Sequence, residues 1–391
     1  MQPARADYEV LIIGAGPAGL AAAAMLRRSK VDALIVERAG DVGNSWRSRY
    51  DHLHLNTVRW LSHLPGLRMP RSYGRWPSKD SFVEYLEQYQ RHFALPVQWD
   101  TVVERVERAN GSWSLKTTGG ELSAQRLVIT TGYMREPAIP EWPGRDKFAG
   151  DLIHSASYRN PTPYIGRNVL VVGTGNSGAD IAFDLAKHGA GRVWISVRSG
   201  PNIVKAETLG VPYALLARLS APMPRRLVDF FGKVIQRSSI GDLSRYGIPG
   251  PTVGGYTSIV RDLRVPIVDF GFVRQVKQKR IEVVKAVEGF QGSEVLLSGG
   301  ARLSPDLVVA ATGYRPALER LVGGLGVLAP NGRPVVHGAR FHASAPRLYF
   351  VGFVDALGGQ LREMGKQAKA LARAIASERK PKPNRDGHAG R

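Results

Sequence analysis

Residues 10–20 read VLIIGAGPAGL, and residues 169–179 read VLVVGTGNSGA. In each stretch an apolar run typical of a buried strand leads into three glycines spaced G-x-G-x-x-G, and a helix-like stretch follows. This strand–turn–helix order is the dinucleotide-binding fingerprint of the Rossmann fold. One copy alone is weak evidence. Two copies predict an α/β chain with two doubly wound, three-layer domains, each binding a dinucleotide.

The order of the remaining segments predicts how the two domains are connected. Residues 167–198 repeat the strand–turn–helix–strand order of residues 8–36, and the chain closes with an apolar strand and a long helix. The simplest architecture is a second domain inserted into the first. We expect residues 1–165 and 300–380 to form the first domain and residues 166–299 the inserted one. The tail, residues 381–391, is rich in charge and predicted to be disordered.

The composition excludes several classes of chemistry. The chain of 391 residues contains no cysteine, which excludes disulfides, thiolate metal sites and electron relay through a cysteine pair. His52 and His54 could contact one metal ion, but no third ligand completes a set, so no metal site is expected. No apolar run reaches the ~18–20 residues that a membrane span needs. The polar start resembles no signal peptide, and a cytoplasmic location is expected.

The charge balance is strongly basic. The formal net charge is +21, which could indicate a nucleic acid or an anionic membrane as partner. The basic residues are scattered along the chain, however, and phosphorylated cofactors also attract them. We therefore expect neither nucleic acid nor membrane as a partner, and the oligomeric state is left open.

The first glycine turn predicts FAD as its ligand. The phosphates of a dinucleotide bind where the turn opens the helix, because free N–H groups point there. The second strand of this unit ends at Glu37, followed by Arg38. A carboxylate at this position accepts hydrogen bonds from ribose hydroxyls and repels a 2′-phosphate. The predicted FAD contacts in this unit are Gly14, Gly16, Pro17, Ala18, Gly19, Glu37 and Arg38.

The second glycine turn predicts NADPH. Its second strand ends without an acid, in the residues Val197, Arg198 and Ser199. Arginine pairs with a 2′-phosphate through charge-assisted hydrogen bonds. The predicted NADPH contacts are Gly173, Gly175, Asn176, Ser177, Gly178, Arg198 and Ser199.

A third motif lies between the two units, Phe148-x-Gly150-x-x-x-His154-x-x-x-Tyr158. It matches the F-x-G-x-x-x-H-x-x-x-(Y/W) signature of flavin-containing monooxygenases, and the chain resembles that family over nearly its whole length. The stretches 225–229, 240–242 and 266–269 look most similar to the YUCCA branch, whose members oxidatively decarboxylate indole-3-pyruvate.

The resemblance implies a flavin-dependent monooxygenase of the EC 1.14.13 type. NADPH would reduce FAD, the reduced flavin would form a C4a-(hydro)peroxide with O2, and a small organic substrate would take one oxygen atom. Both an amine or sulfide and a carbonyl such as an arylpyruvate stay open as substrates. The alternatives are an NADPH:acceptor oxidoreductase or NADPH oxidase without oxygen insertion, and a non-catalytic NADPH-sensing flavoprotein.

The resemblance also points to individual residues. Asn56 is the candidate catalytic residue, because an amide can both donate to and accept from a reacting oxygen. His154 and Tyr158 are expected to hold the two domains in register. Trp60, Tyr73 and Trp76 either line the substrate pocket or belong to the core. Further cofactor contacts are expected from Trp46, from the strand ends Thr131-Gly132 and Thr312-Gly313, and from Gly352 and Gln360 before the last helix.

Overall fold

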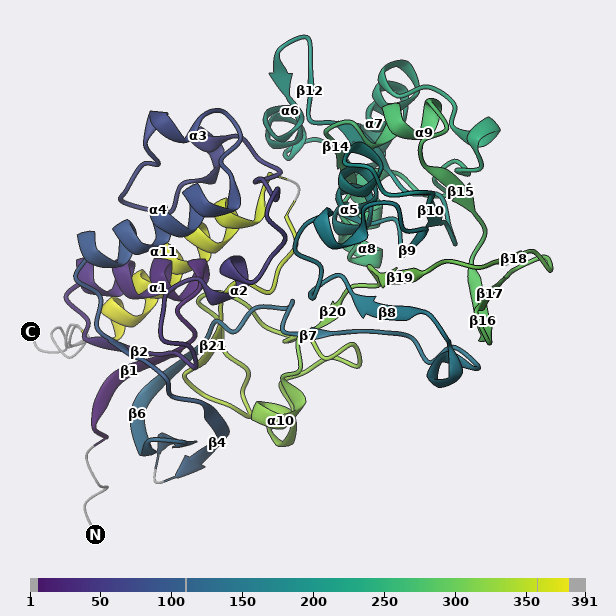
Figure 1. Ribbon diagram of the computed structural model, residues 1–391. Coiled ribbons are helices and arrows are strands. Elements are labelled where there is room, and N and C mark those ends of the chain that lie inside the picture. The colour runs from purple at the N-terminus through teal and green to yellow at the C-terminus, as the bar shows by residue number, and fades with distance from the viewer. Residues whose placement is uncertain (1–5, 110, 357, 380–391) are drawn as a thin grey trace, which may run out of the picture.

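The computed structural model describes residues 6–109, 111–356 and 358–379 (Figure 1). The mixed α/β fold has parallel strands at the centre of each of two units, as the two fingerprints predict. In Figure 1 the N-terminal elements, the light-green helix at residues 319–322 and the yellow C-terminal helix form one lobe, and residues 151–310 form the other. The predicted disordered tail, residues 381–391, lies outside the described residues.

The sheet of the first unit has the order β3-β2-β1-β6-β5-β4, and β21 pairs with β6. Strands β1, β2, β3, β6 and β21 run parallel where they pair, while β4, β5 and β6 form the antiparallel meander. The strands are β1 (Tyr8–Ile13), β2 (Ala33–Val36), β3 (Val97–Gln98), β4 (Val103–Ala109), β5 (Ser112–Thr117), β6 (Gly120–Ile129) and β21 (Leu348–Phe350).

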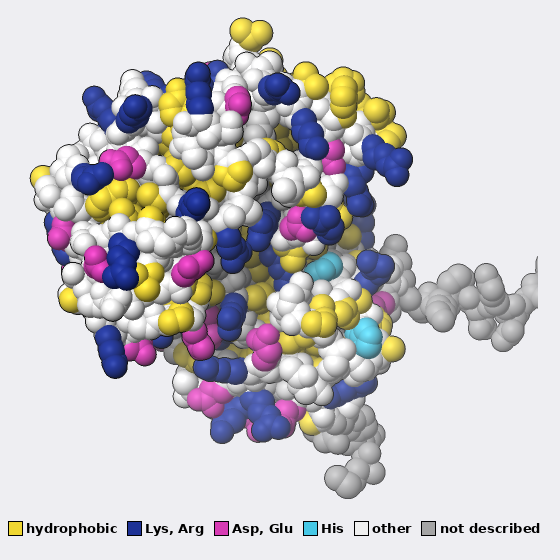
Figure 2. Space-filling model, turned by 90° about the vertical axis from the view of Figure 1, so that its right-hand side faces the viewer, with side chains coloured by type: hydrophobic (Ala, Val, Ile, Leu, Met, Phe, Trp, Pro, Cys, Tyr) yellow, Lys and Arg dark blue, Asp and Glu magenta, His cyan; other side chains and the backbone are white. Residues whose placement is uncertain are grey.

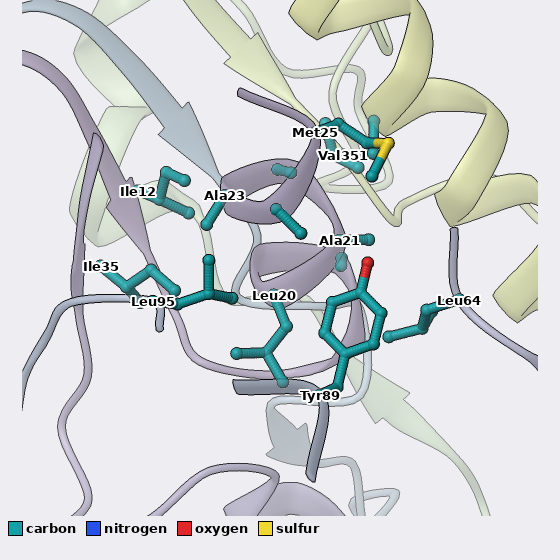
Figure 3. Close-up of a cluster of buried hydrophobic side chains, with 14 of the residues drawn as sticks. Ile12, Leu20, Ala21, Ala23, Met25, Ile35, Leu64, Tyr89, Leu95 and Val351 are labelled. Carbon is teal, nitrogen blue, oxygen red and sulfur yellow. The ribbon is translucent and has the colours of Figure 1, made fainter. Parts of the chain in front are cut away.

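Three helices cover one face of this sheet: α1 (Pro17–Arg28), α4 (Lys79–His92) and α11 (Gln360–Glu378). Figure 3 shows Leu20 and Ala21 of α1 beside Tyr89 of α4 in the buried core. Alanines in α1 leave room for the neighbouring helix, which explains the run at residues 21–24. The hydroxyl of Ser78 accepts the N–H of Ser81 at 3.1 Å and caps α4.

The sheet of the second unit is entirely parallel, with the order β15-β10-β9-β19-β8. Helix α5 (Asn176–Lys187) follows β9 through the second glycine turn. Sheet pairing adds β8 and β19, which lie on either side of residues 166–299 in the sequence, and the domain limits stay a prediction. The strands are β8 (Asp151–His154), β9 (Val169–Val172), β10 (Val193–Ser196), β15 (Glu282–Val284) and β19 (Leu307–Ala310).

The irregular stretch after β10 forms a helical cap on the second unit. Its longest helix is α7 (Arg225–Ser239). Its other elements are β11 (Ile203–Lys205), β12 (Glu207–Thr208), β13 (Val211–Pro212), α6 (Tyr213–Ser220), α8 (Gly255–Asp262), β14 (Ile267–Asp269) and α9 (Phe272–Lys277). No described helix combines the length and the apolar character needed to cross a bilayer.

Small elements connect the two units. Strands β7 (Glu136–Pro137) and β20 (Tyr314–Arg315) pair antiparallel where the chain passes from one unit to the other. Strands β16 (Val287–Gln291), β17 (Glu294–Leu297) and β18 (Arg302–Leu303) form a separate small sheet. The short helices are α2 (Asn44–Arg47), α3 (Arg59–Ser62) and α10 (Glu319–Val322).

Polar contacts on α5 fix how the units face each other. The hydroxyl of Tyr50 donates to Asp180 at 2.8 Å, and that of Tyr158 donates to Asp184 at 2.8 Å. The Nδ1 atom of His52 lies 3.1 Å from Asp184. Burial raises the pKa of Asp180 to about 6, against the opposing effect of the Tyr50 hydrogen bond. A segment of the first unit is thereby fixed to the helix that opens at the second glycine turn.

Candidate active site

The three glycines of the first turn have three separate tasks. Gly14 has a φ of +108°, which L side chains rarely adopt. A Cβ on Gly19 would lie 1.9 Å from the carbonyl oxygen of Gly14, so only glycine lets α1 approach the turn. A Cβ on Gly16 would have no described atom within 4 Å, because this backbone faces open space. That space is where a pyrophosphate binds at a helix N-terminus.

The second turn repeats this geometry. Gly173 has a φ of +117°, and a Cβ on Gly178 would lie 2.0 Å from the carbonyl oxygen of Gly173. A Cβ on Gly175 would again have no described atom within 4 Å. Both units therefore present a backbone cradle that a side chain would fill.

A cavity of about 450 Å³ lies between the first unit, the second turn and the helical cap. Asn176 and Ser177 contribute to the wall from the second turn, and Gly359 and Gln360 place the N-terminus of α11 in the same cavity wall. The predicted residues that line this cavity are Gly14, Gly16, Pro17, Ala18, Glu37, Arg38, Trp46, Asn56, Thr131, Gly132, Asn176, Ser177, Gly352 and Gln360.

The carboxylate of Glu37 is fixed against the first turn. It accepts the N–H of Ala15 at 2.6 Å and the N–H of Ala39 at 3.0 Å. The negative charge therefore stands at the end of β2, where a ribose is expected.

The carboxamide of Asn56 lies half-buried in the cavity wall, with its neighbours held on both sides. The N–H of Leu55 donates to the carbonyl of Pro77 at 2.9 Å, and the Thr57 hydroxyl lies 2.6 Å from that of Ser62. The side chain of Asn56 has no hydrogen bond to the described part of the chain, so its donor and acceptor are available to a ligand.

Polar groups near the N-terminus of α11 test whether a flavin dinucleotide fits. The buried Thr131 hydroxyl has no partner among the described residues, although it lines the cavity. Gln360 accepts from the Tyr133 hydroxyl at 3.1 Å and donates to the Gly352 carbonyl at 3.3 Å. One cavity therefore brings together a hydroxyl without a partner among the described residues, an open glycine turn and a helix N-terminus. These groups fit a polar, anionic cofactor.

Other predicted residues lie outside the cavity lining. Gly19, Gly173, Gly175 and Gly178 shape the turns behind it. Arg198 and Ser199 are exposed just after β10, and the Ser199 hydroxyl accepts from Arg264 at 3.3 Å.

Thr312 and Gly313 contact the crossover between the units. The Gly313 carbonyl accepts the N–H of Ala138 at 3.0 Å and lies 2.9 Å from Nε2 of His154. A strand ending in Thr-Gly is compatible with a close approach of either a cofactor or another strand, and here another chain segment lies closest. Burial lowers the pKa of His154, as suits a neutral ring that serves the crossover.

Sequence reasoning missed much of the cavity wall. Trp60, Tyr73 and Trp76 lie outside the lining. Arg49 lines the cavity, and its guanidinium lies 4.5 Å from the centre of the Tyr314 ring. The wall nearest the helical cap comes from Tyr213, Ala214, Ile259, Val265, Pro266 and Val268. The stretch 266–269 carries only a resemblance, and no motif places any of these six residues at a cavity, because only the tertiary fold brings the cap there.

Metal ligands do not gather in the described parts of the chain. No group of three or more His, Asp or Glu side chains there has the arrangement of a metal site. Nδ1 of His54 lies 2.6 Å from the backbone carbonyl of His52, whereas Nδ1 of His52 lies 3.1 Å from Asp184, so the two rings have separate neighbours.

Comparisons with known proteins agree with this geometry. Residues 11–208 match the model of the pyridine nucleotide-disulphide oxidoreductase family. The chain is 35% identical over 310 residues to indole-3-pyruvate monooxygenase YUCCA1 of Oryza sativa subsp. japonica, covering 78% of this chain and 76% of that one. It is 32% identical over 382 residues to probable indole-3-pyruvate monooxygenase YUCCA7 of Arabidopsis thaliana, covering 94% and 87%. The chain belongs to the flavin-containing monooxygenase family.

Solved structures support the same assignment. A flavin-containing monooxygenase from Stenotrophomonas maltophilia aligns with a TM-score of 0.72 at 25% identity, covering 95% of this chain and 98% of that one. OTEMO in complex with FAD and NADP aligns with a TM-score of 0.73 at 15% identity, covering 95% and 84%, and shows the shared fold. The protein is an FAD monooxygenase that uses NADPH. Without cysteine, it cannot pass electrons through a cysteine pair of its own.

The different tasks of Gly16 and Gly19 predict different consequences of the same substitution. Gly19→Ala forces a Cβ onto a backbone carbonyl, so we expect the free energy of unfolding to fall by ~1–3 kcal/mol. Gly16→Ala should fold normally but bind FAD at least about tenfold more weakly, or ~1.4 kcal/mol. Thermal denaturation of the apoprotein and FAD titration measure the two effects. A Gly19→Ala variant with an unchanged melting temperature would contradict the packing argument.

Proposed function

We propose that this enzyme oxidatively decarboxylates an arylpyruvate such as indole-3-pyruvate, with NADPH and O2 as co-substrates. The similar proteins named above support this substrate class. The observation that carries the proposal is the cavity itself, which joins the FAD turn, the NADPH turn and an apolar wall in one space. FAD contacts are assigned to the predicted residues of the first unit and NADPH contacts to those of the second. The cytoplasmic location and the absence of a nucleic-acid partner stay predictions.

The charges in the cavity wall favour an acid over an amine. Arg38, Arg49 and Arg135 line the cavity, and Glu37 is the one acidic residue in its described lining. A protonated amine would meet like charges there, whereas the carboxylate of a 2-oxo acid would be stabilised. Burial lowers the pKa of Arg135 from its ordinary value, but arginine stays charged in proteins.

The apolar wall near the helical cap suits the aromatic ring of the substrate. Ala214, Ile259 and Val268 offer apolar surface beside the Tyr213 ring. Burying an aromatic side group against such a wall is favourable and also excludes water from the cavity. FAD held by the first glycine turn and Glu37 would supply the redox chemistry with NADPH and O2. An arylpyruvate would then gain one oxygen atom and lose CO2, and the second oxygen atom would leave as water.

The protein's own groups position and shield the reacting atoms. The carboxamide of Asn56 donates to one oxygen and accepts from another group without supplying a labile proton. The N-terminus of α11, which begins at Gln360, directs the positive end of its dipole to the cavity and stabilises negative charge there. Tyr133 holds Gln360 in place through its hydroxyl.

A substrate panel tests the proposal. Arylpyruvates, sulfides, amines and ketones are each supplied with NADPH and 18O2, and the labelled product is counted per NADPH consumed. We expect arylacetate and CO2 in near-equal amounts from an arylpyruvate, and little product from amines. Hydrogen peroxide as the sole product with every substrate would instead identify an NADPH oxidase. Labelled sulfoxide in place of arylacetate would move the assignment to S-oxygenation.

Replacement of Asn56 by alanine should uncouple NADPH consumption from product formation. The loss of one hydrogen-bonding partner, worth ~1–1.5 kcal/mol, should lower product per NADPH about tenfold and raise hydrogen peroxide correspondingly. The measurement compares oxygenated product, peroxide and NADPH in the same reaction. Asn331→Ala, in a turn far along the sequence, serves as control and should stay coupled. Unchanged coupling in Asn56→Ala would make Asn56 a structural residue only.

Arg198→Ala should change the preference between the two nicotinamide cofactors. If Arg198 pairs with the 2′-phosphate, its loss removes ~1.5–3 kcal/mol of binding to NADPH but not to NADH. The KM for NADPH should therefore rise about tenfold or more, with little change for NADH. Arg192→Ala is the matched control, because Arg192 precedes β10 at its other end and pairs with Glu282 at 3.0 Å. Equal changes in both KM values would refute the assignment.

A further inference from the structure

Helix α7 presents its apolar side chains to solvent. None of its residues is buried. Its apolar positions follow the spacing of one helical face, i, i+3, i+4, i+7 and i+8. These exposed side chains are Leu227 (45%), Phe230 (61%), Phe231 (49%), Val234 (51%) and Ile235 (39%).

The polar side chains of α7 make its contacts with the rest of the protein. The carboxylate of Asp229 accepts the N–H of Tyr256 at 2.8 Å and the N–H of Thr257 at 3.2 Å. Seven residues further on, Gln236 accepts the N–H of Ile203 at 3.2 Å. Since these two residues share a face, the hydrogen bonds hold the polar side of α7 inward. The outward position of the apolar side is therefore built into the fold.

Neighbouring elements extend the apolar surface. Leu209, at the tip of the β12–β13 hairpin, is 99% exposed, and Leu219 at the end of α6 is 65% exposed. Figure 1 places β12, α6 and α7 at the same end of the molecule, and Figure 2 shows hydrophobic side chains along that upper edge with Lys and Arg among them. We name this surface the apolar edge; it comprises Leu209, Leu219, Met223, Leu227, Phe230, Phe231, Val234 and Ile235.

The charge around the apolar edge selects its partner. Between residues 209 and 239 the one acidic residue is Asp229, which is turned inward, while the basic residues are Arg218, Arg225, Arg226, Lys233 and Arg237. A second copy of a chain with a net charge of +21 would bring like charges together. A nucleic-acid duplex would leave the phenylalanines uncovered. An anionic bilayer surface accepts both the apolar and the basic side chains.

We propose that the apolar edge inserts into the headgroup region of an anionic membrane and holds the enzyme at its surface. From the sequence alone we expected no membrane partner, because the basic residues are scattered along the chain. Association at the surface needs only an amphipathic face with basic neighbours, which the fold brings together here. Helix α6 connects the edge with the cavity, since Tyr213 and Ala214 at its start line the cavity wall. The proposal does not depend on which substrate the enzyme oxygenates.

Vesicle flotation with the FAD-loaded full-length protein tests the proposal. We expect the protein to float with phosphatidylcholine vesicles that contain phosphatidylserine, far less with phosphatidylcholine alone, and less as salt is raised. F230S/V234S should bind at least about tenfold more weakly, because two side chains that insert are lost. I165S/V335S is the matched control, with side chains that are 60% and 46% exposed outside the edge, and should bind as the wild type does.

The electrostatic part has its own matched pair of variants. R226Q/K233Q should lower binding to the anionic vesicles. R105Q/K116Q removes the same charge from exposed positions on β4 and β5 and should bind as the wild type does. An equal loss of vesicle binding in R226Q/K233Q and R105Q/K116Q would show that only the net charge of the protein matters, and would overturn the proposal. Hydrogen exchange of α7 in the unmodified enzyme provides a readout without substitution, and we expect added protection when anionic vesicles are present.

Two further outcomes would also overturn the proposal. The first is the absence of flotation by the wild-type enzyme on anionic vesicles. The second is self-association in sedimentation without vesicles that F230S/V234S abolishes, which would assign the apolar edge to a second copy of the chain. FAD content and NADPH oxidation of each variant are measured first, and we expect both to match the wild type.

Discussion

The fold depends on the close backbone contact at each glycine turn. The third glycine lies so near the carbonyl of the first that no side chain fits between helix and strand. Because the helix reaches the strand this closely, its N-terminus opens directly onto the sheet edge, and its free N–H groups meet a ligand there. The same contact is repeated in both units, from Gly14 and Gly19 to Gly173 and Gly178. The two cofactor sites thus result from one local constraint used twice.

The contacts of α5 determine what lies between the two cofactor sites. Tyr50 and His52 of the first unit meet Asp180 and Asp184 of the second. The segment that carries Tyr50 and His52 continues directly to Asn56. The contacts of Tyr50 and His52 with α5 therefore help to position the candidate catalytic amide in the cavity. Burial disfavours the ionised form of Asp180, and the hydrogen bond from Tyr50 across the two units opposes this effect. A cavity shared by both turns requires the two units to keep one orientation.

The sequence predicted the parts of the site that local geometry determines. Positive φ angles, close packing and an open cradle each require glycine, so the turns could be identified from the glycine spacing together with the apolar strand before it and the helix after it. Glu37 follows from its place at the end of a strand. The cavity wall from the helical cap could not be predicted, because residues such as Tyr213 and Val268 reach it only through the tertiary fold. The periodicity of residues 225–239 indicates an amphipathic helix, but which face is covered depends on where Asp229 finds its donors.

The hydrogen bonds of Glu37 have a thermodynamic consequence for cofactor loading. Its carboxylate accepts the backbone N–H of Ala15 in the first turn and the backbone N–H of Ala39 just beyond β2. A site that is preorganised in this way loses little conformational entropy when the dinucleotide binds. Most of the interaction energy with the adenosine half of FAD is then retained as affinity, and apoenzyme that has folded should regain its flavin without a slow rearrangement of this turn.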